Sequence, residues 1–149
     1  MKKGDLGLTD LIGEKSVKKS DLRVRVLAYL EDFMAALGMV KLKTQDNNID
    51  LIQNSLLSVM QIVSGAKAEL NLTTLAGIED VIKNSDFGGK NTAAQLPGCN
   101  ETETALRNAL AKCHLAESYL TELNITDSSV LAFINHSGKY LAAVTSKYI

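Results

Sequence analysis

The stretch Ser20–Lys41, SDLRVRVLAYLEDFMAALGMVK, contains the most apolar window of the chain and decides its fold class. Large apolar residues recur in it at the three- and four-residue spacing of one helical face. Ser20 is a suitable N-cap, because its hydroxyl can accept a backbone N–H of the first turn. The pattern predicts a helix from Ser20 to about Lys41, and the alanines between the large residues predict contacts on most of its sides. Its apolar stripe consists of Val24, Leu27, Leu30, Phe33, Met34 and Leu37.

Four further segments show helical spacing. Asn100 followed by Glu103 is a capping-box pattern, with Asn in place of the usual Ser or Thr. Either Asp127 or Ser128 can cap the last segment. The expected helices cover about 50–68, from 73 or 74 to before 86, 100 to about 123, and 127 or 128 onward. Connections this short make most consecutive helices antiparallel, so we expect an all-α fold, a four- or five-helix bundle.

Two segments lack such spacing. Residues Met1–Lys19 are polar and contain three glycines, so they are expected to be loop. The stretch DFGGKNTAAQLPGC, residues 86–99, is the longest irregular one between helices. Long loops on a helical scaffold often carry function, which makes residues 86–99 a candidate functional loop.

Composition limits the classes of protein that fit. The chain has 149 residues, one domain's worth, with 16 Lys+Arg against 17 Asp+Glu and a net charge of −1. A near-neutral chain has no overall attraction to nucleic acid or to an anionic membrane. Its two cysteines cannot build a disulfide framework or a four-cysteine zinc site. The first residues lack the apolar region of a secretory signal, so we expect a single cytoplasmic domain over residues 1–149.

Motifs spread along the chain resemble one known family. GDLGLTDLIGEKSVKKSDLRV, residues 4–24, is similar to a family motif of the form Gly-Asp-x-Gly-x-Thr-x-Leu-x-Gly-Gly followed by Val-Ser-Lys-Asp-Asp and Arg-Val. QLPG at 95–98 and FINHSGKYL at 133–141 look like two later motifs in the same order. The family is the propanediol-utilisation type of ATP:cob(I)alamin adenosyltransferase. Each motif is weak, but their collinearity covers nearly the whole chain.

The resemblance implies a five-helix bundle that assembles as a homotrimer, with ATP bound near subunit interfaces. It also implies transfer of the 5′-deoxyadenosyl group of ATP, with Mg²⁺, to the reduced cobalt of cobalamin, releasing triphosphate. Closely spaced glycines suit such a ligand, because their backbone N–H groups can approach phosphate oxygens. The nucleotide-binding candidates are Gly4, Asp5, Gly7, Thr9 and Lys19. The alternative is that these glycines only shape a flexible terminus.

The chain departs from the family in the N-terminal stretch and on two later helices. Where the family has arginines that contact the triphosphate, this chain has Leu110, His114, Leu115 and Ser118, and a leucine offers no donor to phosphate. Glu14 replaces a family glycine and places a negative charge near the expected phosphates. Glu117 and Asn135 keep the family's residue types and are the candidate catalytic residues. Replacement contacts to the triphosphate could come from Lys112, His114, His136 and Lys139.

The histidines and Cys113 also allow plainer interpretations. If His114 and His136 lie close together, they could ligate a metal. Two histidines without a third ligand are weak evidence for a metal site. We therefore predict no metal site, and expect each histidine to be a partly buried polar residue. Cys113 is interpreted as a small apolar filler, and Glu117 could pair with His114.

Three functions remain open from the sequence. The first is a divergent adenosyltransferase that uses ATP, Mg²⁺ and cobalamin. The second is a catalytically inactive paralogue that still binds nucleotide or corrinoid. The third is a purely structural helical oligomer with a relic N-terminal motif.

Overall fold

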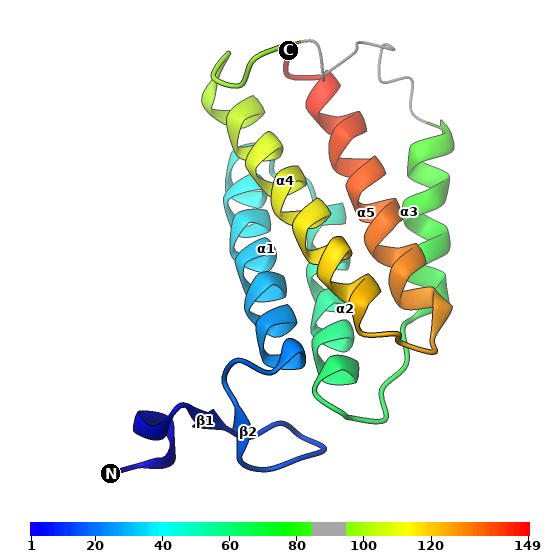
Figure 1. The fold of residues 1–149 in the computed structure, drawn as a ribbon. Coiled ribbons are helices and arrows are strands. Elements are labelled where there is room, and N and C mark those ends of the chain that lie inside the picture. The colour runs from blue at the N-terminus through cyan, green and yellow to red at the C-terminus, as the bar shows by residue number, and fades with distance from the viewer. Residues whose placement is uncertain (85–94) are drawn as a thin grey trace.

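Helix α1, Leu22–Thr44, forms one side of a bundle of five helices (Figure 1). The computed structural model describes residues 1–84 and 95–149, so the candidate loop at 86–99 is described only from residue 95 onward. The other helices are α2 (Asn48–Val63), α3 (Leu72–Asn84), α4 (Glu101–Glu122) and α5 (Ser128–Ser146). Consecutive helices run in opposite directions, as expected for most of them (Figure 1).

The order of the helices in space differs from their order in the chain. The most extensive contact of α1 is with α4, and α4 packs next against α5. Helix α3 lies against α5, while α2 covers the other side of α1. Helix α4 therefore lies between α1 and α5, and its inward face is completely buried. Within the described residues, no helix has both the length and the apolarity needed to cross a membrane.

The core confirms half of the predicted apolar stripe of α1. Leu30, Phe33 and Leu37 have no exposed surface. Val24, Leu27 and Met34 are only half-buried, and Ala28 is exposed. The prediction of contacts on most sides of α1 is therefore wrong: α2 and α4 cover two sides, and the remaining face stays open.

Two helix limits differ from the predicted ones, the start of α1 and the end of α2. Asp21, not Ser20, caps α1, since its carboxylate accepts the N–H of Arg23 at 2.9 Å. Helix α2 ends at Val63 instead of residue 68 because Gly65 adopts a positive φ of 102°. Such a backbone conformation ends a helix and favours glycine.

The N-terminal segment, residues 1–20, is more ordered than the loop that its composition predicts. It contains a 3₁₀ turn (Lys3–Leu6) and two short antiparallel strands, β1 (Leu8–Thr9) and β2 (Val17–Lys18). Two-residue strands produce no readable alternation, so this ladder gives no periodic signal. The segment lies beside the end of the bundle where α1 begins and α2 ends (Figure 1).

Candidate functional site

The N-terminal segment brings three of the predicted nucleotide-binding residues together. The Nζ of Lys19 donates to the carbonyl of Gly4 at 3.0 Å, and the backbone N–H of Lys19 donates to the carbonyl of Gly7 at 2.8 Å. Gly7 has a φ of 76°, a conformation that lets the chain reverse between the 3₁₀ turn and β1. The ammonium of Lys19 is exposed, and within residues 1–84 and 95–149 its one bond is to a neutral carbonyl, so an anion can compete for it.

The other two nucleotide candidates lie apart from this contact. Asp5 accepts the backbone N–H of Lys2 at 3.2 Å and thereby closes the 3₁₀ turn. Thr9 is half-buried and lines a cavity of about 230 Å³ between the segment and α1. The wall of this cavity includes Val24, Ala28 and Glu31. The structure thus places Thr9 near α1 and Asp5 at the turn.

A close backbone approach fixes the segment to the end of α2. The N–H of Gly13 donates to the carbonyl of Ser64 at 2.9 Å, and the N–H of Ile12 donates to the Ser64 hydroxyl at 2.9 Å. A Cβ atom on Gly65 would lie 2.9 Å from backbone atoms of Gly13, closer than real Cβ atoms come. Gly13 therefore serves this contact, which the sequence pattern alone could not reveal.

The Glu14 carboxylate has a cationic partner within the same region. Its carboxylate lies 2.8 Å from Nη1 of Arg23. Arg23 also donates to both carboxylate oxygens of Asp21 at 3.0 Å. The Arg23 hydrogen bonds hold the pKa of Asp21 below its ordinary value. Arg23 is thus shared by Glu14 and Asp21, so Glu14 has a cationic partner but the two carboxylates outnumber the single guanidinium.

On α4 and α5, the candidate residues face different neighbours. A Cβ atom on Gly138 would lie 3.8 Å from the imidazole of His114, which places His114 against α5. Nε2 of His136 instead lies 3.0 Å from Oε1 of Glu79 on α3. Asn135 is exposed and Glu117 is half-buried. Among the described residues no ion pair joins Glu117 to His114, and no three His, Cys, Asp or Glu side chains gather to hold a metal.

Cys113 behaves as the small apolar filler that the sequence predicts. It is completely buried, and its thiol donates weakly to the carbonyl of Ile134 at 3.5 Å. Burial, helped by the nearby charge of Glu117, raises the thiol pKa to about 12. A thiol with this pKa forms almost no thiolate at neutral pH, so Cys113 is not a nucleophile.

Two of the four predicted replacement contacts line one cavity, and one is already engaged. Nζ of Lys112 lies 2.7 Å from Oδ2 of Asp32, so this ammonium is occupied by α1. His136 and Lys139 line a cavity of about 360 Å³ between α3 and α5. Lys83, which the sequence analysis missed, lines the same cavity. Only contact between separate helices brings Lys83 there, so no local signal could have identified it.

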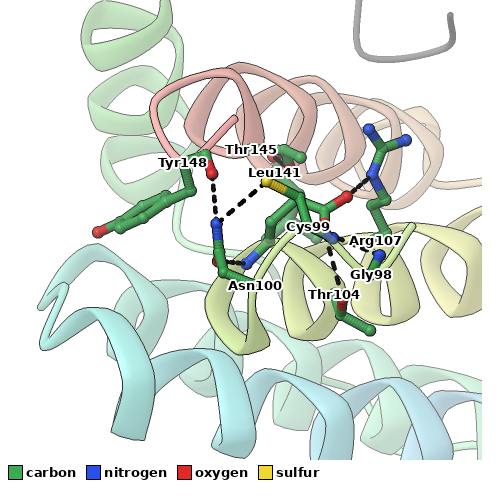
Figure 2. Close-up of polar contacts among 9 residues, drawn as sticks. Gly98, Cys99, Asn100, Thr104, Arg107, Leu141, Thr145 and Tyr148 are labelled. Atoms are coloured by element: carbon green, nitrogen blue, oxygen red, sulfur yellow. Dashed lines mark hydrogen bonds and ion pairs between the residues drawn. The ribbon is translucent and has the colours of Figure 1, made fainter. Parts of the chain in front are cut away.

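Figure 2 shows a polar cluster at the start of α4, which includes Gly98, Asn100 and Arg107. The sequence predicts this cluster only in part. Asn100 caps α4 by accepting the N–H of Glu103 at 2.8 Å, as the capping pattern predicts. The Glu103 carboxylate, however, accepts the N–H groups of Gly98 and Cys99, each at 3.1 Å, and pairs with Arg107. Burial opposes its charge, but these bonds together hold the Glu103 pKa below its ordinary value. The cluster fixes the QLPG segment to α4.

Comparisons with known proteins agree with this architecture. A family model described as cobalamin adenosyltransferase matches residues 1–147. Among solved structures, one variant of the PduO-type ATP:corrinoid adenosyltransferase from Lactobacillus reuteri, complexed with cobalamin and ATP, matches with a TM-score of 0.82 and 21% identity. That match covers 97% of this chain and 90% of the other. A second variant of that enzyme, complexed with ATP, matches with a TM-score of 0.80 and 23% identity, covering 97% and 91%. A search of curated proteins found no match.

Proposed function

Because the chain belongs to the cobalamin adenosyltransferase family, we propose that it is an ATP:corrinoid adenosyltransferase. The reaction forms a bond between the cobalt of cob(I)alamin and C5′ of ATP. Both electrons of this bond come from the reduced cobalt, while the C5′–O bond breaks and triphosphate leaves. We further propose that the protein is cytoplasmic, in keeping with two cysteines that form no disulfide. We also propose that it assembles as a homotrimer, as the family resemblance implies.

The observation that carries this proposal is the ordered N-terminal segment. The family model includes these residues, and the segment brings the Lys19 ammonium next to the glycine turn at Gly4 and Gly7. Lysine binds phosphate as a compact point charge, and glycine leaves backbone groups open to a phosphate oxygen. The Lys19–Gly4 bond is exposed and joins a cation to a neutral acceptor, so its exchange for a phosphate is favourable.

The remaining candidates have narrower roles in this proposal. The Asp5 carboxylate supplies oxygen atoms at the 3₁₀ turn, and the Thr9 hydroxyl supplies one on the side of the segment that faces α1. Mg²⁺ bound to ATP needs only one or two protein carboxylates, because the phosphates complete its coordination. Asp5 is therefore the residue that would hold it, and Mg²⁺ would supply charge neutralisation of the triphosphate. Glu117 and Asn135 are proposed to orient substrate at the surface of α4 and α5.

A second function is favoured by one specific observation. At the α4 positions where the resembling family has arginines, this chain has Leu110, His114, Leu115 and Ser118. The nearby Lys112 is already paired with Asp32. Each missing charge-assisted hydrogen bond removes roughly 1.5–3 kcal/mol of phosphate binding. A protein that binds nucleotide or corrinoid without transferring the adenosyl group is therefore the second candidate.

An anaerobic single-turnover assay separates these functions. Excess protein is mixed with cob(I)alamin and Mg·ATP, and the corrin absorbance is followed. We expect adenosylcobalamin to form with the wild type and with Lys67→Ala, an exposed lysine outside the segment, but not with Lys19→Ala. No product from the folded wild type contradicts the transferase, and calorimetry with ATP then tests the binding function. Equal activity of Lys19→Ala would place the phosphates elsewhere.

A further inference from the structure

The cavity between α3 and α5 is lined mainly by charged side chains. Helix α3 contributes Glu79, Ile82 and Lys83, which share one face because they are spaced by three and four residues. Helix α5 contributes His136 and Lys139, also three residues apart. The volume of about 360 Å³ lies near the lower end of the range of about 300–1,000 Å³ for small-molecule sites.

The cavity lies on a different side of α5 from the groove occupied by His114. His136 faces Glu79 on α3, whereas Gly138 faces His114 on α4. Two residues along a helix are about 200° apart, so these two contacts lie on nearly opposite faces of α5. The α3–α5 cavity is therefore separate from the surface where Glu117 lies.

Two lysines against one carboxylate give the lining a net positive charge. Nε2 of His136 and Oε1 of Glu79 lie 3.0 Å apart and satisfy each other. Within residues 1–84 and 95–149, Lys83 and Lys139 take part in no ion pair. The cavity thus presents two ammonium groups, one from each helix, beside a single apolar wall at Ile82.

We propose that this cavity binds a phosphate group between the ammonium groups of Lys83 and Lys139. A phosphate group carries about −1.5 to −2 charges at neutral pH, which matches two lysines. Carboxylates carry one charge and fit this pair less well. The His136–Glu79 pair shapes the cavity, and the Glu79 carboxylate limits the affinity by repelling the ligand. This inference uses only the charges and the cavity, and it does not depend on adenosyl transfer.

The proposal is tested by calorimetry on the full chain, without ATP or corrinoid. Tripolyphosphate is titrated into Lys19→Ala, which lacks the lysine of the N-terminal segment, and into the same protein carrying Lys83→Gln and Lys139→Gln. We expect binding by Lys19→Ala and at least tenfold weaker binding when both cavity lysines are replaced. Adding Lys67→Gln instead should leave the affinity unchanged. Absence of binding by Lys19→Ala, or equal binding by all three proteins, would overturn the proposal.

Glu79→Gln provides a test in the opposite direction. Removing a negative charge from the lining should increase the affinity several-fold, whereas damage to the fold would decrease it. A decrease by a variant with unchanged circular dichroism would overturn the proposal. Orthophosphate and ATP, titrated in parallel, distinguish the source of the phosphate group. Tight orthophosphate binding indicates free phosphate, and displacement of tripolyphosphate by ATP indicates the nucleotide.

Discussion

The Glu103 carboxylate accepts the backbone N–H of Gly98 at 3.1 Å, across the start of α4 (Figure 2). Glu103 is completely buried, and its carboxylate also pairs with Arg107. A buried charge without its partner is strongly destabilising. Glu103 therefore holds the QLPG segment and balances Arg107 at the same time.

The first prediction follows from this cluster. Glu103→Gln preserves the shape of the side chain but removes its charge, so Tm should fall by about 5–10 °C. Glu101→Gln is the matched control, because Glu101 occupies the same first turn and pairs with Lys43 at the surface. The control should lower Tm by less than about 2 °C. Similar decreases in Tm for both variants in a thermal melt would show that the buried charge of Glu103 contributes no more to stability than the exposed charge of Glu101.

The second prediction concerns acid. Because the pKa of Glu103 is lower in the folded chain than its ordinary value of 4.5, the unfolded chain binds the proton more readily. Stability from this group is fully present above pH 4.5 and is lost as the pH falls through the folded value. The difference in unfolding free energy between wild type and Glu103→Gln should therefore be smaller at pH 3 than at pH 6. Urea titrations of both proteins at both pH values measure this difference. A difference that does not change between pH 3 and pH 6 would contradict the lowered pKa of Glu103.

The third prediction tests the contact between Gly13 and Gly65. Gly65→Ala introduces a Cβ at 2.9 Å from the Gly13 backbone, at a φ of 102° that alanine rarely adopts. We expect faster hydrogen exchange in residues 8–19 and a lower Tm. Gly38→Ala, in α1 with no atom near the new Cβ, should instead stabilise the fold by about 0.5–1 kcal/mol. Unchanged exchange in Gly65→Ala would mean that the segment does not need this contact.

The fourth prediction concerns the two thiols. Cys99 is exposed, whereas Cys113 is buried with a pKa of about 12. A thiol reagent at pH 8 should label one cysteine per chain in the native state and two in denaturant. Mass spectrometry of tryptic peptides identifies the site. Rapid native labelling of Cys113 would indicate that the α4–α5 contact opens.

The fifth prediction tests whether missing arginines limit phosphate binding on α4. His114→Arg and Ser118→Arg are suitable because both positions are exposed, so the new charge stays hydrated. Either should strengthen ATP binding at least tenfold, the effect of one charge-assisted hydrogen bond. Asn108→Arg is the control at another exposed position of α4. An equal gain in the control would reveal a general charge effect, with no specific phosphate contact.

Local patterns predicted most of the fold. All five helices and the caps at Asn100 and Asp127 follow from spacing and short-range capping chemistry. The end of α2 was missed because it depends on Gly65, whose conformation is stabilised by a segment fifty residues earlier in the chain.

The candidate site was less predictable, because most of its contacts also join segments that are far apart in the chain. The contact of Lys19 with the glycine turn joins residues that are near in sequence. The partner of His136 and the lining at Lys83 depend on packing between α3 and α5. The ion pair of Glu14 with Arg23 likewise requires the folded path of the segment. Side chains that meet across helices carry no periodic signal.

The packing of α1 on α4 also has a consequence for synthesis on the ribosome. Bonds across this pair join residues far apart in the chain, such as Lys112 and Asp32, 80 positions apart. A nascent chain that has emerged only through α3 lacks the helix that covers Leu30 and Phe33. The first three helices therefore cannot complete their core before α4 has been synthesised. A chain truncated after α3 would expose hydrophobic surface, which promotes aggregation and binding by chaperones.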